Sequence, residues 1–126
     1  MKCGLYIIQP NEAYEKTLVF ADLIQRAHSN TLDWQPFHPG VVIARLYKED
    51  DGHTSALLRY EPGASVPHHV HPGFEHLFII SGDQADQAGN HPAGTLLVNP
   101  PGSEHHVTSP SGCLVLAIWE QPPKFL

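Results

Sequence analysis

Proline and glycine interrupt this chain at short intervals from residue 36 onward, and this punctuation limits what the chain can fold into. The sequence has 12 prolines and 10 glycines among 126 residues. Proline breaks a helix and glycine favours turns, so the pattern argues against long helices in this region. Between the breaks lie short runs rich in β-branched and aromatic residues, which is typical of β-strands.

About eight short strands at regular spacing predict an all-β sandwich or barrel. The strands are expected at residues 41–48, 53–60, 66–71, 74–81, 94–99, 105–109 and 113–120, with a polar hairpin over 82–89. The length fits one domain with one core. We therefore expect residues 41–126 to form a single β-barrel.

Residues 1–40 have a different pattern, and we expect them to be an N-terminal extension that packs on the barrel. Leu5–Ile8 predicts a short strand that ends before Pro10. Apolar residues at 20, 23, 24 and 27 have helical spacing, which predicts a short helix within 12–28. The stretch 30–40 shows no clear period and is expected to be a packed connector.

The composition excludes several classes of function. The net charge is −6, and the seven lysines and arginines are scattered, so no basic face for nucleic acid is expected. No apolar stretch reaches the ~18 residues of a membrane span, and the N-terminus lacks a signal-peptide core. A cytoplasmic location follows as the expectation. Cys3 and Cys113 do not make a disulfide framework, and Cys113 is expected to be a buried thiol.

Two glycine-bounded groups of polar residues carry the chemistry. His69 and His71 are two residues apart, so they share one face of a strand, and Glu75 follows a turn opposite them. His105 belongs to the second group and follows the stiff turn Pro100-Pro101-Gly102. Three imidazoles and one carboxylate suit a divalent metal, so the expected metal ligands are His69, His71, Glu75 and His105.

Strand alternation also predicts what surrounds that site. Leu77, Ile79 and Val107 share the phase of the ligands and are expected to form an apolar floor. His68, His76 and His106 have the opposite phase. The remaining histidines are expected to be surface residues: His28, His38, His53 and His91.

The ligand set leaves the metal and the chemistry open. Zinc, iron, manganese and nickel all fit one divalent site of this kind, with zinc and iron foremost. No acid or base residue can be assigned, because Glu75 is taken as a ligand. Tyr47, Arg59 and Tyr60 could reach a cavity, but each is expected to be a framework residue.

The two groups resemble the two motifs of the cupin superfamily. The first, Gly-x5-His-x-His-x3-Glu-x6-Gly, matches from Gly63 to Gly82. The second, Gly-x5-Pro-x-Gly-x2-His-x3-Asn, matches from Gly94 to His105, with Ser109 in place of the final Asn. This resemblance implies a double-stranded β-helix, the jelly-roll barrel of cupins, with metal at the four ligands named above.

A narrower resemblance is to the cupin domain of ChrR-type anti-sigma factors, in which the metal is typically zinc. It is carried by Arg59 to Ala64, Pro92-Ala93-Gly94, Asn99 to Ser103 and Ser111-Gly112-Cys113. Such factors hold the sigma factor through a separate zinc domain with a His-x3-Cys-x2-Cys run. Residues 1–40 hold one cysteine and no such run, so a sigma-factor partner is not expected.

Three functions remain open from the sequence. The first is a metal-dependent small-molecule enzyme of dioxygenase type or another oxidoreductase. The second is a metal- or ligand-sensing regulatory module like the ChrR cupin domain, and the third is a structural zinc site without turnover. A small-molecule ligand and a homodimer are the expected partners, and the Leu5–Ile8 strand is a candidate for crossing onto the neighbouring subunit.

Overall fold

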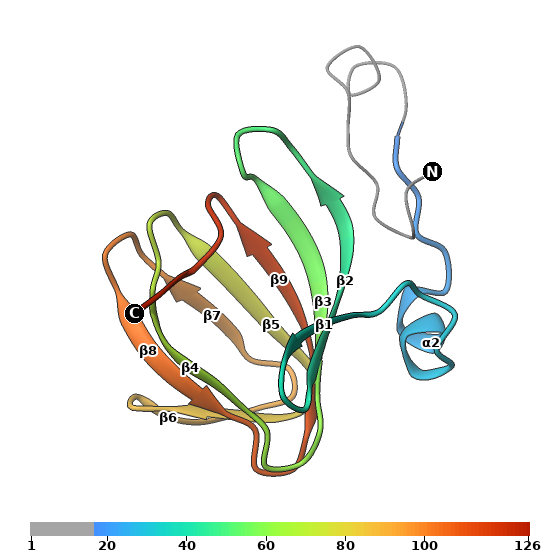
Figure 1. Ribbon diagram of the computed structural model, residues 1–126. Helices are drawn as coiled ribbons and strands as arrows, with labels where there is room; N and C mark the ends of the chain where they lie inside the picture. The colour runs from blue at the N-terminus through green and yellow to red at the C-terminus, as the bar shows by residue number, and fades with distance from the viewer. Residues whose placement is uncertain (1–16) are drawn as a thin grey trace.

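The computed structural model describes residues 17–126 and is almost entirely β-structure (Figure 1). In these residues a short helix, α2, precedes the strands. The elements are α2 (Leu23–His28), β1 (Gln35–His38), β2 (Val41–Lys48), β3 (Thr54–Tyr60), β4 (Ser65–Val70), β5 (Glu75–Asp86), β6 (Gly89–Pro92), β7 (Leu96–Asn99), β8 (Glu104–Thr108), β9 (Cys113–Trp119) and β10 (Lys124–Phe125).

The strands form one curled antiparallel sheet in the order β1-β2-β3-β9-β5-β8-β4-β10, and both β6 and β7 pair with β5. β5 is the longest strand and links the two halves of the barrel. Its first half lies between β9 and β7, and its second half pairs with β6 and β8. The prediction of an all-β jelly-roll barrel is therefore confirmed.

The main core lies inside the curled sheet. The predicted floor residues are all buried there, with Leu77 3%, Ile79 0% and Val107 2% exposed. Cys113 is a free thiol in the same core, as predicted.

A second, smaller apolar cluster lies on the outer face of β3 and β9, where Ala27 of α2 packs on Leu57 and Leu114. Arg59 donates hydrogen bonds to the Ala27 carbonyl at 2.7 Å and to Asn30 Oδ1 at 2.8 Å. Its guanidinium also lies 4.4 Å from the centre of the Trp34 ring. These contacts hold the chain after α2 against the barrel and make Arg59 a framework residue.

The N-terminal part confirms one expectation and refines another. The predicted short helix is present as α2. The segment expected to be a connector contains β1, which pairs with β2 at the edge of the sheet. Proline lacks a backbone N–H, and an edge strand is where Pro36 is tolerated. The Leu5–Ile8 prediction lies outside the described residues, and the division of the chain at residue 40 stays a prediction. No helix within residues 17–126 has the length and apolarity that crossing a membrane requires.

A β-bulge in β5 changes which side chains face the interior. The register of β5 on β9 shifts between Ile79 and Ser81. Side chains at odd-numbered positions therefore face the interior before the bulge, and side chains at even-numbered positions face it afterwards. Gln84 consequently points inward and is 1% exposed. Gly82 follows the bulge with φ 75°, and a Cβ there would lie 1.9 Å from the Gly112 carbonyl oxygen. Only glycine allows this backbone conformation and this close approach to Gly112.

Candidate metal centre

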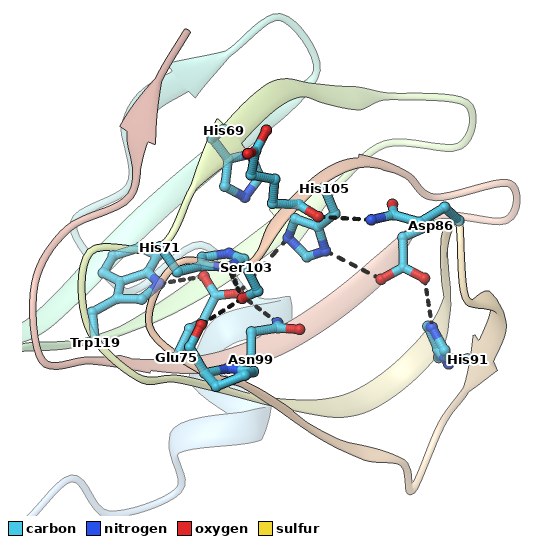
Figure 2. Close-up of polar contacts among 12 residues, drawn as sticks. His69, His71, Glu75, Asp86, His91, Asn99, Ser103, His105 and Trp119 are labelled. Atoms are coloured by element: carbon cyan, nitrogen blue, oxygen red, sulfur yellow. Dashed lines mark hydrogen bonds and ion pairs between the residues drawn. The ribbon is translucent and has the colours of Figure 1, made fainter.

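Three buried histidines face one another inside the barrel (Figure 2). His69 on β4 lies directly opposite His105 on β8, and His71 follows β4 where its backbone bonds to Gly102 and Ser103. The ring centroids are 4.6 to 5.0 Å apart. One ring nitrogen of each histidine lies within 4.8 Å of the other two, so the three could hold one metal ion.

Each of these rings is fixed through its Nδ1 atom. His69 Nδ1 lies 2.8 Å from the Pro67 carbonyl oxygen, and His105 Nδ1 lies 3.1 Å from Asp86 Oδ2. A carbonyl and a carboxylate accept hydrogen bonds, so both Nδ1 atoms donate. His71 Nδ1 lies 2.9 Å from Ser103 Oγ, whose own proton goes to the Pro100 carbonyl at 2.6 Å. Ser103 must then accept from His71, and all three rings donate through Nδ1.

With the proton on Nδ1, a neutral ring keeps its lone pair on Nε2. Within residues 17–126, the Nε2 atoms of His71 and His105 are buried and have no hydrogen-bond partner. Burial lowers the pKa of His69 to about 4, against the opposing effect of the Pro67 carbonyl, and burial also lowers the pKa of His105. Neutral imidazole is the form that binds metal, so this donor set fits a divalent ion.

Glu75 stands beside two of the three imidazoles. Its Oε1 lies 3.0 Å from His71 Nε2 and 3.8 Å from His105 Nε2. Burial acts to raise the pKa of Glu75, but the closeness of His71, followed by the N–H of the Trp119 indole, holds it below the ordinary value. An ionised oxygen facing a lone pair at 3.0 Å needs a cation between or beside them, either a second proton on His71 or a metal ion.

Neighbouring strands hold the Glu75 carboxylate from both sides. Glu75 pairs across the sheet with Asn99 at the end of β7 and with Trp119 at the end of β9. Asn99 Nδ2 donates to Oε1 at 2.9 Å, and the Trp119 indole N–H donates to Oε2. Glu75 and Trp119 are 3% and 4% exposed, so the carboxylate is shielded from solvent, and the two donors fix its direction.

Asp86 connects the centre to the outside of the barrel. Its Oδ2 accepts from His105, and its Oδ1 lies 2.9 Å from His91 Nε2 (Figure 2). Burial acts to raise the pKa of Asp86, but its hydrogen bonds with His91 and His105 lower it below the ordinary value. A carboxylate behind a histidine in this way fixes the tautomer and makes the other nitrogen a better ligand.

The structure brings the predicted histidines together and leaves the others apart. His68, His76 and His106 have side chains on the outer face, as their phase predicted, and His68 bonds to exposed Glu104 at 2.7 Å. His91, expected to be a plain surface residue, supports Asp86 instead. Sequence reasoning missed the residues that orient the centre: Asp86, His91, Asn99, Ser103 and Trp119. The Ser103 position alone had a visible signal, since it follows the Pro-Pro-Gly turn that precedes His105.

A narrow cavity adjoins the centre. His69, Glu75 and His105 line one part of it, and its other walls are largely apolar, apart from Tyr60 and Gln84. Its volume is about 20 Å³, which is room for about one water molecule. The further lining residues are Phe37, Leu58, Val66, Leu77, Val107, Trp119 and Pro123.

Comparison with known proteins identifies the family. The chain matches the ChrR cupin-like domain family over residues 24–121, so it belongs to that family. In the crystal structure of Rhodobacter sphaeroides SigE in complex with the anti-sigma ChrR, the matching chain is 26% identical with a TM-score of 0.63. The match covers 70% of this chain and 48% of that one, so this chain spans about half of its relative's length.

Two further structures share the fold. A putative acetylacetone dioxygenase from Methylibium petroleiphilum is 19% identical, with a TM-score of 0.71 and 88% and 84% of the two chains covered. An acetylacetone dioxygenase from Acinetobacter johnsonii is 17% identical, with a TM-score of 0.71 and 89% and 78% covered. At these identities the likeness shows the barrel and nothing more specific. No curated protein sequence matches this chain.

Proposed function

We propose that His69, His71, Glu75 and His105 together hold one divalent metal ion. The proposal rests on Nε2 lone pairs that converge from three fixed rings and on the Glu75 carboxylate beside two of them. Zinc and iron are the foremost candidates, with manganese and nickel as alternatives. When bound, the ion would supply Lewis acidity, or one-electron chemistry if it is iron or manganese.

On this centre we place a metal-dependent small-molecule enzyme of dioxygenase type. The observation that supports this choice is the narrow cavity beside the centre, which His69, Glu75 and His105 line on one side and largely apolar side chains line elsewhere. Its apolar walls exclude water, which strengthens electrostatic interactions inside. Glu75 remains a ligand, held in place by Asn99 and Trp119, and no group is assigned as general acid or base.

The first experiment is metal analysis of the protein purified without added metal, next to His69→Ala and Glu75→Ala. We expect about one metal ion per chain in the wild type, none in His69→Ala, and a reduced content in Glu75→Ala. Unchanged metal in both variants would show that the ligand assignment is wrong. Oxygen uptake by iron-, nickel- or manganese-loaded protein with a panel of diketones and thiols then tests turnover.

Membership of the ChrR cupin-like family favours a second candidate, a metal- or ligand-sensing regulatory module. No oxygen uptake with any metal, together with a specific partner recovered by the full chain, would favour this function. A sigma factor among the recovered proteins would support it further. A structural zinc site is the third candidate, and a crystal structure of the zinc-loaded protein with no open coordination position would establish it.

We also propose that the chain forms a homodimer through the outer face of β5 and β7. Phe78, Leu96 and Val98 are 40–57% exposed there, and Phe78 lies directly opposite Leu96 across the two strands. β7 pairs with β5 and with no other described strand, so its second edge is open to another chain. Leu96→Glu should reduce the mass in solution to that of a monomer. Deletion of residues 1–10 tests the swapped-strand alternative, which requires the mass to fall.

A further inference from the structure

The two edges of the curled sheet meet beside the metal centre through side chains alone. Among the described strands, β1 pairs only with β2 and β10 only with β4, so they end the strand order on opposite sides. No backbone hydrogen bond joins β1 to β10 within residues 17–126. The Phe125 ring lies 6.1 Å from the Phe37 ring and 4.7 Å from the His38 ring, measured between centroids. Phe37, His38 and Phe125 thus form a seam between the two edges.

We infer that small molecules reach the metal centre through this seam and that Phe125 controls the passage. The inference rests on the proposed function, because it takes the three histidines and Glu75 as the metal site. It goes beyond that function by naming the entrance and the residue that limits what enters.

The cavity beside the centre approaches the surface at the seam. All of its lining residues are buried except Phe37 and Pro123. Phe37 belongs to β1 and Pro123 comes directly before β10, so the two stand on opposite sides of the seam. The cavity has room for about one water molecule, so a larger substrate needs these walls to separate.

Phe125 covers one of the proposed ligands. It lies opposite His69 in the β4–β10 pair, and directly opposed residues point to the same face of a sheet. The two ring centroids are 5.4 Å apart, and His69 is only 3% exposed. Displacement of Phe125 would therefore uncover His69.

Of the two edge strands, β10 has the weaker hold on the barrel. On the β1 side, Phe37 packs against the main core and stacks on Trp119 at 6.4 Å. β10 has two residues, both exposed, which pair with two residues of β4. One more backbone bond follows, from the Leu126 N–H to the His68 carbonyl at 3.3 Å. Short, exposed segments with few buried contacts open most easily, so β10 is the side of the seam that moves.

The chain just before β10 is anchored, which lets β10 move while β9 stays in place. The Glu120 N–H donates to the Phe74 carbonyl at 3.1 Å, and the Phe74 N–H donates to the Glu120 carboxylate at 2.7 Å. Gln121 Nε2 donates to the Asp51 carbonyl at 2.6 Å. The next two residues are prolines, which have no N–H to bind this stretch to the barrel. Figure 1 shows the chain passing here from the end of β9 to the side of β4.

The rates of cobalt binding and release test the passage. Stopped-flow mixing of the metal-free full chain with cobalt(II) gives the binding rate from the visible spectrum, and an excess of EDTA gives the release rate. We expect Phe125→Ala to raise both rates about tenfold, because the loss of its aromatic contacts makes the open state more frequent. The dissociation constant should then stay the same. If Phe125 only packs on His69, the release rate and the dissociation constant rise together at an unchanged binding rate, and the inference is wrong.

Two further variants separate the seam from general loosening of the segment. Leu126→Ala is the matched control, because Leu126 is 75% exposed and its backbone bond to β4 survives the change. Both of its rates should equal those of the wild type. His38→Ala removes the same contact from the β1 side, so it should speed both rates. Combined with Phe125→Ala it should add nothing further, and effects that multiply would overturn the inference.

The metal-free protein gives a readout that involves no metal. Diethyl pyrocarbonate acylates neutral imidazoles that it can reach, and mass spectrometry with fragmentation reports each histidine separately. His69 should react about tenfold faster in Phe125→Ala than in the wild type, whereas His53, in the loop before β3, should react equally in both. An unchanged reactivity of His69 would overturn the inference. A wild type that binds no cobalt, with His69 still more reactive in Phe125→Ala, would contradict the proposed metal centre and support the seam as the way into the cavity.

Discussion

The Asp86 carboxylate accepts a hydrogen bond from His105 Nδ1 at 3.1 Å, and this contact decides which nitrogen of the His105 ring faces the other two imidazoles. Because Asp86 also bonds to His91, it is itself held from behind. The centre is therefore oriented from the outside of the barrel as well as from the strands that carry the ligands.

Loss of the Asp86–His105 hydrogen bond should weaken metal binding, although all of the proposed metal ligands remain in place. We expect Asp86→Ala to lower the affinity for zinc by about 10- to 100-fold, the range typical of groups that orient a ligand histidine. Competition with a chromophoric chelator measures it. Glu104→Ala is the control, because Glu104 bonds to His68, a histidine that faces away from the centre. Equal affinities in the two variants would show that Asp86 does not orient the ligand.

The stability of the metal-free protein should fall as the pH drops from about 6.5 to about 4. Burial lowers the pKa of His69 from 6.5 to about 4, so in this window the unfolded chain binds a proton that the folded chain does not. Stability then rises with pH. His69 alone accounts for up to about 3 kcal/mol, and the lowered pKa of His105 acts in the same direction.

Urea unfolding of metal-free protein at pH 7.5 and pH 5 measures this loss. His69→Phe should reduce the difference between the two pH values, whereas His53→Phe should leave it unchanged, because His53 lies in the loop before β3 and is not part of the buried histidine cluster. A wild-type stability that is equal at both pH values would contradict the buried neutral state of His69.

Residues at fixed spacing allowed the barrel and the convergence of His69, His71 and His105 to be predicted, but they gave no account of the interior beyond Ile79. Leu77 and Ile79 share the phase of Glu75 and are buried with it, as expected. The β5 bulge then reverses which side chains face the interior, and nothing in the Ile79-Ile80-Ser81 sequence predicts a bulge. Gln84 and Asp86 were missed because residues 82–89 were expected to be a polar hairpin, whereas β5 continues to Asp86. The pairing of Asp86 with His105 also depends on the packing of β5 against β8, which sequence periodicity does not encode.

The Trp119 indole should stabilise the ionised Glu75 carboxylate, since its N–H donates to Oε2 in a buried position. Trp119→Phe keeps an aromatic ring and removes that donor. We expect a loss of about 1–3 kcal/mol in the free energy of unfolding, the usual cost of leaving a buried charged acceptor short of a donor. Trp34→Phe is the control, because Trp34 Nε1 is buried without a hydrogen-bond partner in residues 17–126. Equal losses would assign the effect to ring packing.

Gly82 lies between the β5 bulge and Asp86, so its replacement should lower both the stability of the protein and its affinity for metal. Gly82→Ala combines a positive φ of 75° with a Cβ only 1.9 Å from the Gly112 carbonyl oxygen, so the backbone must move. Gly63→Ala is the matched control, with φ 81° and no atom within 4 Å of the added Cβ, and it should cost only about 1 kcal/mol. Gly82→Ala should cost several times more in urea unfolding. Because Asp86 lies four residues further along β5, the same variant should also bind zinc more weakly than Gly63→Ala. A Gly82→Ala protein with the stability and zinc affinity of Gly63→Ala would show that the bulge does not set the position of Asp86.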